Sequence, residues 1–277
     1  MPLIVTSAAG ANGDGHGALL AFAPDGRPLG AFSTDRRITD PRGLGVDRAA
    51  GLLFLNSGSD RVLALDARGQ VVRDSGPIDG LNPGGGNFGP DGRYCVGLRS
   101  ARTIMAFAPA LDAPGTLALP PGIVPFPRGF AFAPDDRLFL ASGIGPDGTG
   151  DDTIHAFAPS GAPLPGWHVA DPDLSPLDLI LAPNGNVVVS SERPFGTPDA
   201  VTTIREYDRL DGRLVRVFSP GRSAQFLKPR GLRFGPDGRL YCVARDEVVA
   251  FDFTTGQCLG AIVALPRLNG QALAFFP

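Results

Sequence analysis

The chain consists of short apolar runs separated by turns that contain glycine and proline. The runs are rich in aromatic and β-branched residues, as strands prefer, and none shows the sustained apolar spacing of three and four residues that marks a helix. The clearest set of runs occupies residues 52–55, 93–96, 137–140, 186–189 and 239–242. The pattern therefore predicts an all-β protein.

These runs belong to a repeated unit that opens with a segment of the type Arg-Gly-Leu-x-Phe and continues into a Pro-Asp-Gly or Pro-Asn-Gly turn. The turn prolines Pro90, Pro134, Pro183 and Pro236 recur at intervals of 44 to 53 residues, which is the length of a four-stranded propeller blade. A third run follows in six copies, at residues 20–24, 63–66, 105–109, 155–159, 205–208 and 249–252. A second glycine turn then returns a fourth strand, so we predict a six-bladed β-propeller of four-stranded antiparallel blades.

The two ends of the chain complete one blade. Residues 3–7 form a second strand with no first strand before it, whereas residues 270–277 match the start of the repeat and stop where its turn would begin. We expect residues 270–277 to be the innermost strand beside residues 3–7, which closes the ring and removes two sheet edges. Residues 1–277 then make one propeller domain.

Composition fits many short buried strands, because 38 glycines and 28 prolines accompany 43% hydrophobic residues. The net charge of −3 comes from 25 basic and 28 acidic residues without runs, which argues against nucleic acid or a membrane as a partner. No signal-peptide pattern or bilayer-length apolar run occurs, so we expect a cytoplasmic protein. Cys95 and Cys242 occupy equivalent positions of two repeats and would lie too far apart for a disulfide.

The repeats, which read Pro-Arg-Gly-Leu-x-Phe-Gly-Pro-Asp-Gly in their fullest form, resemble those of the NHL-repeat and gluconolactonase-like six-bladed propellers over essentially the whole chain. The resemblance implies the fold and leaves the function open, because such propellers include lactonases, lyases, synthases and purely binding proteins. In the metal-dependent lactonases of this group, a divalent cation is held by a Glu, an Asn and an Asp that lie just before the Gly-Leu of innermost strands.

The corresponding positions of this chain are occupied by Arg42, Gly84, Arg128, Leu177, Arg230 and Gln271. None of these is a carboxylate, and guanidinium groups repel a cation, so we expect no bound metal and no other cofactor. Asp178 and Asn269 are close neighbours of the ring, and a shift of one residue would bring them into it. A metal-dependent lactonase therefore stays an alternative.

The three arginines of this ring fall at equivalent positions near the mouth of the central channel. Guanidinium forks bind carboxylate or phosphate groups in bidentate geometry, so one interpretation is an anion-binding mouth. Asn269 and Gln271 are further candidates for contacts with the ligand. In the alternative interpretation the arginines are structural, and each bonds carbonyl groups of its neighbouring blade.

Three long loops, at residues 8–16, 143–152 and 191–199, are expected on one face of the propeller. Loops held by a rigid scaffold are where binding residues concentrate, so this face is the predicted ligand face. Its candidates for proton transfer are His16, Glu192 and Asp178. The alternatives are a mobile surface histidine at position 16 and a solvated carboxylate at position 192 that pairs with Arg193.

Two functions remain open at this point. The first is a cofactor-independent hydrolase, lyase or isomerase whose arginines anchor a small carboxylate-bearing molecule in the channel mouth. The second is a propeller that binds a metabolite or a partner protein on the same face without chemistry. Convergence of Glu192, Asp178 and an arginine on one deep pocket would favour the first. The sequence identifies neither the substrate nor the oligomeric state.

Overall fold

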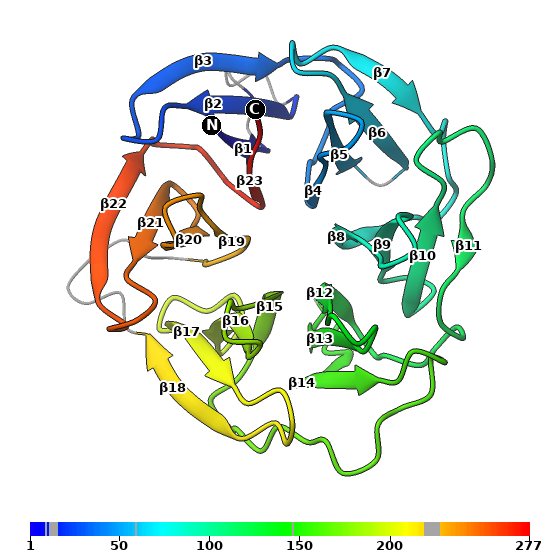
Figure 1. Cartoon of the computed structure of the whole chain (residues 1–277), viewed down its shortest axis with the longest axis vertical. Helices are drawn as coiled ribbons and strands as arrows, with labels where there is room; N and C mark the ends of the chain where they lie inside the picture. Colours follow the sequence, from blue (N-terminus) through cyan, green and yellow to red (C-terminus); the bar gives the residue numbers. More distant parts are fainter. Residues whose placement is uncertain (9, 11–15, 59, 146, 219–227) are drawn as a thin grey trace.

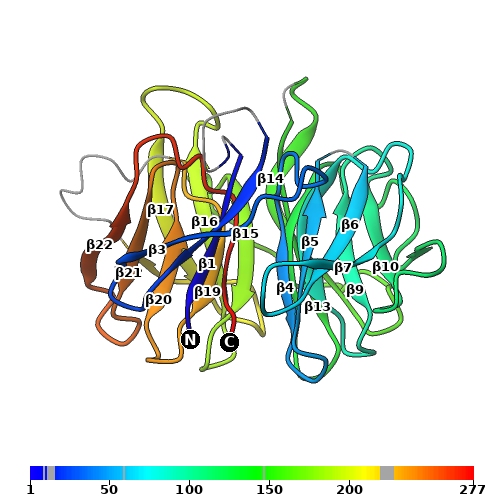
Figure 2. The same ribbon diagram turned by 90° about the horizontal axis from the view of Figure 1, so that it is seen from above.

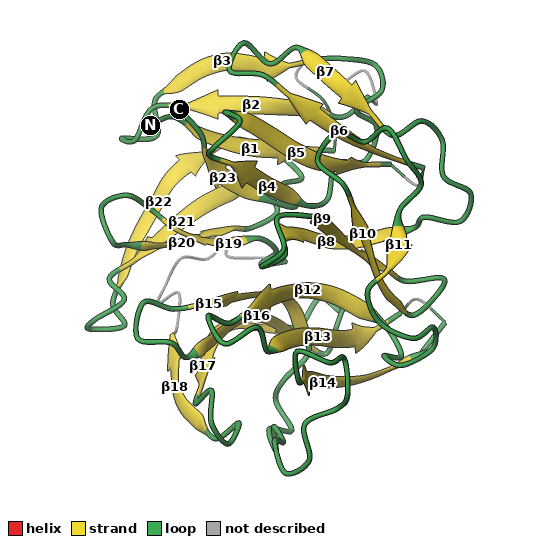
Figure 3. Ribbon diagram, turned by 45° about the vertical axis from the view of Figure 1, so that its right-hand side comes forward, coloured by secondary structure: helices red, strands yellow, loops and turns green. Residues whose placement is uncertain are grey.

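The computed structural model describes residues 1–8, 10, 16–58, 60–145, 147–218 and 228–277. Its strands form six sheets arranged around a central axis as the blades of a propeller (Figure 1). Figure 3 shows strands and loops only, and the described residues contain no helix that could span a membrane. The predicted six-bladed, all-β propeller is confirmed.

The first three blades use both ends of the chain and residues up to 117. From the axis outward, blade 1 contains β23 (Leu273–Phe275), β1 (Leu3–Ser7), β2 (Ala18–Phe22) and β3 (Pro28–Ser33). Blade 2 contains β4 (Leu44–Asp47), β5 (Leu52–Ser57), β6 (Arg61–Leu65) and β7 (Val71–Asp74). Blade 3 contains β8 (Pro83–Phe88), β9 (Tyr94–Leu98), β10 (Thr103–Phe107) and β11 (Thr116–Leu117).

The other three blades follow in chain order. Blade 4 contains β12 (Pro127–Phe132), β13 (Leu138–Ile144) and β14 (Gly150–Phe157). Blade 5 contains β15 (Pro176–Leu181), β16 (Val187–Arg193), β17 (Val201–Tyr207) and β18 (Leu214–Phe218). Blade 6 contains β19 (Leu232–Phe234), β20 (Leu240–Val243), β21 (Glu247–Phe251) and β22 (Cys258–Ala264).

The ring closes as the sequence predicts. Strand β23 pairs antiparallel with β1, with Leu3 opposite Phe275 and Val5 opposite Leu273. The Thr6 hydroxyl oxygen accepts hydrogen bonds from the backbone N–H groups of Gln271 (3.0 Å) and Ala272 (2.9 Å). The two termini consequently lie side by side on one face of the propeller (Figure 2). This closure also fixes residue 271 at the axis.

The hydrophobic core is divided into six clusters, and each lies between two neighbouring blades. The cluster between blades 1 and 6, for example, joins Leu3 and Phe22 to Tyr241 and Val248. Both faces of each sheet are therefore covered, which explains why the strand runs are apolar almost throughout instead of alternating.

Blade 4 departs from the prediction of four strands. Its sheet ends at β14, and only an isolated bridge between Phe157 and Pro163 stands where a fourth strand was expected. Pro163 and Pro165 lack the backbone N–H that a strand ladder needs. Two of the predicted long loops are also shorter than expected, because β13 runs to Ile144 and β16 to Arg193. Most of the loop at 8–16 lies outside the described residues.

Candidate functional site

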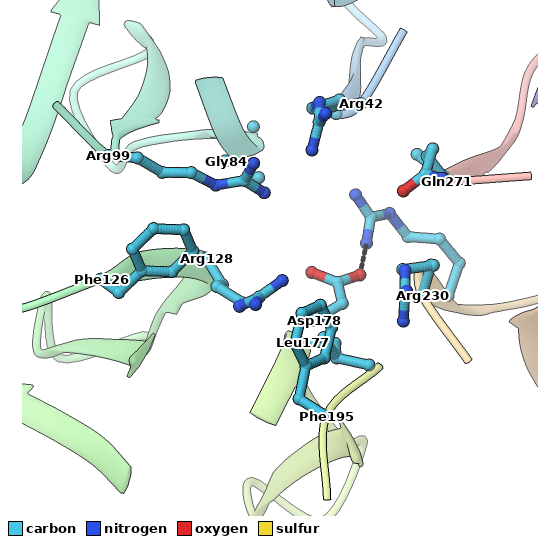
Figure 4. A pocket seen from close by; sticks show the side chains of 15 residues that line it. Arg42, Gly84, Arg99, Phe126, Arg128, Leu177, Asp178, Phe195, Arg230 and Gln271 are labelled. Atoms are coloured by element: carbon cyan, nitrogen blue, oxygen red, sulfur yellow. Dashed lines mark hydrogen bonds and ion pairs between the residues drawn. The ribbon is translucent and has the colours of Figure 1, made fainter. Parts of the chain in front are cut away.

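A cavity of about 260 Å³ lies on the propeller axis, and Figure 4 shows the side chains that converge on it. It is lined by all six residues at which the repeat places the ring, namely Arg42, Gly84, Arg128, Leu177, Arg230 and Gln271. It is also lined by Asp178 and by four residues that the sequence analysis did not select, Arg99, Phe126, Phe195 and Arg233. Five guanidinium groups and one carboxylate thus surround a small space.

The glycine that follows each ring arginine explains this convergence. A Cβ atom on Gly129 would lie 2.2 Å from Oδ1 of Asp178, and one on Gly231 would lie 2.7 Å from the Cα of Ala272. Only glycine lets the innermost strands approach each other so closely. The neighbouring Arg128 and Arg230 are thereby placed beside the axis, where their side chains reach the cavity.

Three of the arginines are paired with carboxylates. Arg42 contacts Asp40 at 2.6 Å, and Arg233 contacts Oδ2 of Asp178 at 3.3 Å. Arg230 donates from Nη1 to Oε2 of Glu192 at 2.9 Å; the Glu192 side chain is almost completely buried, and that of Arg230 is 16% exposed. These three arginines are therefore held in place by acidic partners before any ligand binds.

Arg128 has no carboxylate partner among the described residues. Its guanidinium lies over the rings of Phe126 and Phe195, at 5.0 and 4.4 Å from their centroids, and Nη2 donates to the carbonyl of Ile144 at 2.7 Å. Its Nε is buried without a hydrogen-bond partner. Burial, followed by the charges of Arg230 and Arg42, lowers the pKa of Arg128 to about 9.

Of the five arginines that line the cavity, Arg99 is the second without a carboxylate partner among the described residues. Its guanidinium lies 5.3 Å from the centroid of the Phe126 ring, and its Nε is also buried without a partner. Burial lowers its pKa well below the ordinary value, and Arg42 and Arg128 add to this effect. In Figure 4 the Arg99 and Arg128 side chains extend toward the middle of the cavity from one side.

A signal for Arg99 was present in the sequence. The runs 93–96 and 186–189 are equivalent second strands, so Arg99 and Glu192 occupy the same position of two repeats. Like Glu192, Arg99 follows a second strand on the ligand face, and its position in the repeat makes it an equal candidate. Phe126 and Phe195 gave no such signal, because each lies in an irregular connection between strands.

Asp178 is the predicted acid or base that reaches the cavity. Its Oδ2 accepts a hydrogen bond from the Leu232 N–H at 2.8 Å in addition to its contact with Arg233. Burial raises the pKa of Asp178, although Arg233 and the Leu232 N–H oppose the shift. Figure 4 shows its carboxylate directed into the space between the arginines. A buried carboxyl with a raised pKa in a cavity is suited to carry a proton.

Glu192 lies behind Arg230 and does not line the axial cavity. It borders a separate cavity of about 210 Å³ with Thr197, Lys228 and Arg245. The Glu192 side chain is buried, and its carboxylate is paired with the Arg230 guanidinium. Arg193 is paired with Asp152 instead, at 2.5 Å. The expected alternative of a solvated glutamate paired with Arg193 is therefore wrong.

Of the remaining predicted site residues, one lines the cavity and two do not. Gln271 lines the cavity, and Figure 4 shows its side-chain oxygen directed toward the middle. Asn269 is exposed and does not line the cavity, and its backbone carbonyl accepts a hydrogen bond from the N–H of Ala8 at 3.4 Å. His16 is exposed and does not line the cavity. No group of three or more His, Cys, Asp or Glu side chains in the described ranges is arranged to hold a metal ion.

Comparison with known proteins identifies the fold. No protein-family model and no curated sequence matches the chain. A chain of a nidogen–laminin complex is 12% identical, with 98% of this chain and 97% of that chain covered and a TM-score of 0.75. Virginiamycin B lyase from Staphylococcus aureus is 14% identical, with 84% and 73% covered and a TM-score of 0.61. A gluconolactonase from Xanthomonas campestris is 20% identical, with 96% and 86% covered and a TM-score of 0.60.

The chain is a six-bladed propeller that resembles these proteins in fold at low identity. The resemblance to gluconolactonase-like propellers that the repeats indicate is confirmed at the level of the fold. The same fold carries a lyase, a lactonase and a propeller found in a complex with another protein, so the fold alone does not select among these functions.

Proposed function

We propose that the protein binds a small carboxylate-bearing molecule in the axial cavity. The observation that carries the proposal is the pair of arginines, Arg99 and Arg128, that face the cavity without a carboxylate partner in the described residues. Buried guanidinium groups are ordinarily paired, because an uncompensated buried charge is costly. A bound anion would supply the missing acceptor and offset the burial and the neighbouring positive charges that lower both pKa values.

The size and shape of the site favour a small ligand. The cavity of about 260 Å³ is slightly smaller than the usual range for small-molecule sites, which begins at about 300 Å³. Phe126 and Phe195 hold the Arg128 guanidinium from two sides, which limits the orientations open to its donor groups. Such preorganisation lowers the entropic cost of binding a planar carboxylate in bidentate geometry.

Acid–base chemistry on the bound molecule is the second candidate. It rests on Asp178, which borders the same cavity and has a raised pKa. With the anionic group held by Arg99 and Arg128, Asp178 would donate or accept a proton in a cofactor-independent hydrolase, lyase or isomerase reaction. A metal-dependent lactonase is less compatible with this donor set, since the ring positions carry arginines where a cation needs oxygen ligands.

Thermal unfolding in the presence of small anions tests the binding proposal. Acetate, succinate, citrate and sulfate are compared with chloride at constant ionic strength, and at least one carboxylate should raise the Tm by mass action. Arg99→Met should abolish this rise and leave the Tm without anion unchanged or slightly higher, because it removes a repelling charge. Arg68→Met is the matched control, because Arg68 is exposed in the turn before β7 and does not line the axial cavity. A wild-type Tm indifferent to every anion would refute the proposal.

The chemical candidate needs a separate measurement. Wild-type protein is incubated with each acid that raises the Tm, and products are followed by proton NMR. Asp178→Asn should keep the anion-induced rise of the Tm and lose turnover, because an amide still accepts the Leu232 N–H bond but cannot transfer a proton in the same way. Binding without turnover in the wild type would support the non-catalytic function.

A further inference from the structure

Blade 4 has an open sheet edge beside a second cavity. Strand β14 is the last strand of its sheet, and a groove of about 740 Å³ lies along its residues 151–156. The opposite wall of the groove is formed by residues 163–174, which include Trp167 and Leu174. In Figure 1 this segment is part of the loop that runs outward between β14 and β15.

The segment that would have been the fourth strand is held by blade 5 instead. The Trp167 indole N–H donates to the carbonyl of Arg209 at 3.1 Å. The carboxylate of Asp171 accepts hydrogen bonds from Arg205 and from the Tyr207 hydroxyl, both at 2.7 Å. These contacts draw the segment away from β14, which leaves the edge and the groove between them.

The hydrogen bonds at the end of β14 identify its unused groups. The N–H of Leu164 donates to the carbonyl of Ala156 at 2.8 Å, so the polar groups of Ala156 face outward from the sheet. The backbone N–H and carbonyl groups of successive strand residues point alternately to the two sides of the strand. The N–H and carbonyl of Ile154, two residues before Ala156, therefore face outward too. Beyond this side of β14 the described chain offers no strand to pair with them. The N–H and carbonyl of Ile154 are therefore presented to the groove.

The side chains beside this edge define what would fit. Those of Ile154 and Ala156 pack in one apolar cluster with Val169 and Leu174. On the other side of the strand, the Asp151 carboxylate contacts Nε2 of His155 at 2.8 Å, and both side chains are about one third exposed. In an added strand, the side chain of the residue opposite Ile154 would thus contact the apolar cluster. The side chains of the residues before and after it would lie on the side of Asp151 and His155.

We propose that this groove binds an extended peptide segment with the pattern basic–apolar–basic, added antiparallel to β14. The charge of the groove supports a basic occupant at one place: Asp152 is paired with Arg193 and Asp171 with Arg205, so the acidic group that an incoming basic side chain would meet is the Asp151 carboxylate beside His155. The central residue exchanges two backbone hydrogen bonds with Ile154 and packs its side chain toward Val169. The two flanking basic side chains lie on the Asp151 side. Strand addition of this kind draws affinity from main-chain bonds and specificity from alternate side chains.

Labelled synthetic peptides test the proposal on the full chain. The probe is Ser-Lys-Val-Lys-Ser-amide with a fluorophore on its N-terminal amine, and its counterpart carries Glu at both Lys positions. By fluorescence anisotropy the lysine peptide should bind at least ~10-fold more tightly than the glutamate peptide. Asp151→Lys should reverse this order, whereas Asp79→Lys, which changes an exposed aspartate in the connection between blades 2 and 3 and gives the same net charge, should keep it.

Backbone methylation separates strand addition from simple charge attraction. N-methylation of the central Val removes the N–H that should donate to Ile154, so binding should fall by at least ~10-fold. N-methylation of the second Lys, whose N–H faces away from the sheet, should have a much smaller effect. The amide protons of Ile154 and Ala156 should also exchange more slowly in the complex. Equal binding of both methylated peptides, unchanged exchange at these amides, or no binding of the lysine peptide would each overturn the proposal.

Discussion

The axial cavity and the groove on blade 4 are opposite in charge and in construction. Five arginines and one carboxylate line the cavity, whereas three carboxylates and one arginine line the groove. In the cavity the innermost strands are so close that only glycine fits between them, while in the groove a strand is missing. A repeated blade can therefore gain a site either by changing one residue at an equivalent position or by losing a whole strand.

The largest expected difference between the two regions concerns ring closure. Deletion of residues 270–277 removes β23 together with Leu273 and Phe276, which are fully buried. Because replacing one such side chain by alanine costs ~2–5 kcal/mol, the free energy of unfolding in urea should fall by more than ~5 kcal/mol. The cavity should lose its anion response, because Gln271 and its neighbours hold the ring closed.

Removal of the exposed Pro277 alone is the control for this deletion and should leave the midpoint in urea unchanged. A monomeric deletion variant with the Tm of the full chain would contradict the proposed role of β23 in closing the ring.

The next largest effect should distinguish a buried charge pair from an exposed one. Arg230→Met leaves the Glu192 carboxylate buried at 1% exposure without its partner, so stability should fall by ~3–5 kcal/mol. The double variant Arg230→Met with Glu192→Gln should recover most of this loss. At the groove, Asp151→Asn should change stability by less than ~0.5 kcal/mol. Urea unfolding of the four proteins measures these differences, and equal losses at both regions would contradict the comparison.

The pH dependence of anion binding should separate the regions further. The pKa of Arg128 is lowered to about 9, so the folded protein binds fewer protons than the unfolded chain above this pH. Without anion, stability contributed by this residue should therefore rise as the pH passes 9 and Arg128 loses its charge. The anion-induced rise of the Tm should shrink over the same range, because the charged form binds the ligand.

Peptide binding in the groove is the comparison for this pH series. It should stay constant from about pH 8 to about pH 9.5, because lysine has a pKa of ~10.4 and aspartate is ionised throughout. Arg128→Met should remove the pH dependence at the cavity only. An anion response that persists undiminished to pH 10.5 would contradict the assigned role of Arg128.

The smallest expected effect is that of a chelator. Because guanidinium groups occupy the ring positions that hold oxygen ligands in lactonases, EDTA should change neither the Tm nor the anion response. Metal analysis of purified protein gives the complementary result. Stoichiometric calcium, zinc or manganese, or a Tm that falls on chelation and recovers with metal, would show that the cavity binds a cation.

Much of the architecture could be predicted because it is repeated. Six aligned third strands and the incomplete repeats at the two ends specify the number of blades and the way the ring closes. The repeat also identified the ring positions, all six of which line the cavity. Blade 4 was misjudged because its glycine turn at Ser160-Gly161 has the usual form, whereas the loss of the strand depends on contacts of Trp167 and Asp171 with blade 5.

The ion pairs and cation–π contacts of the site were harder to predict from the sequence than the fold. The partner of Glu192 is a residue 38 positions away, so its neighbour Arg193 was a reasonable and wrong alternative. Phe126 and Phe195 lie in connections without a repeat, and nothing in the sequence indicates that they contact the same guanidinium. Side-chain contacts across blades depend on loop geometry, and the repeat does not encode that geometry.

The meeting of the two termini has a consequence for the order of the chain. Strands β1 and β23 are neighbours in one sheet, and the Phe276 N–H donates to the carbonyl of Pro2 at 3.1 Å. A short linker between Met1 and Pro277 would therefore join the ends with little strain, and new ends could be opened in a surface turn of another blade. The fold would then be compatible with a chain that begins in any of the six blades. Circular permutants would show whether a ring held by six equivalent clusters prefers any one blade as its seam.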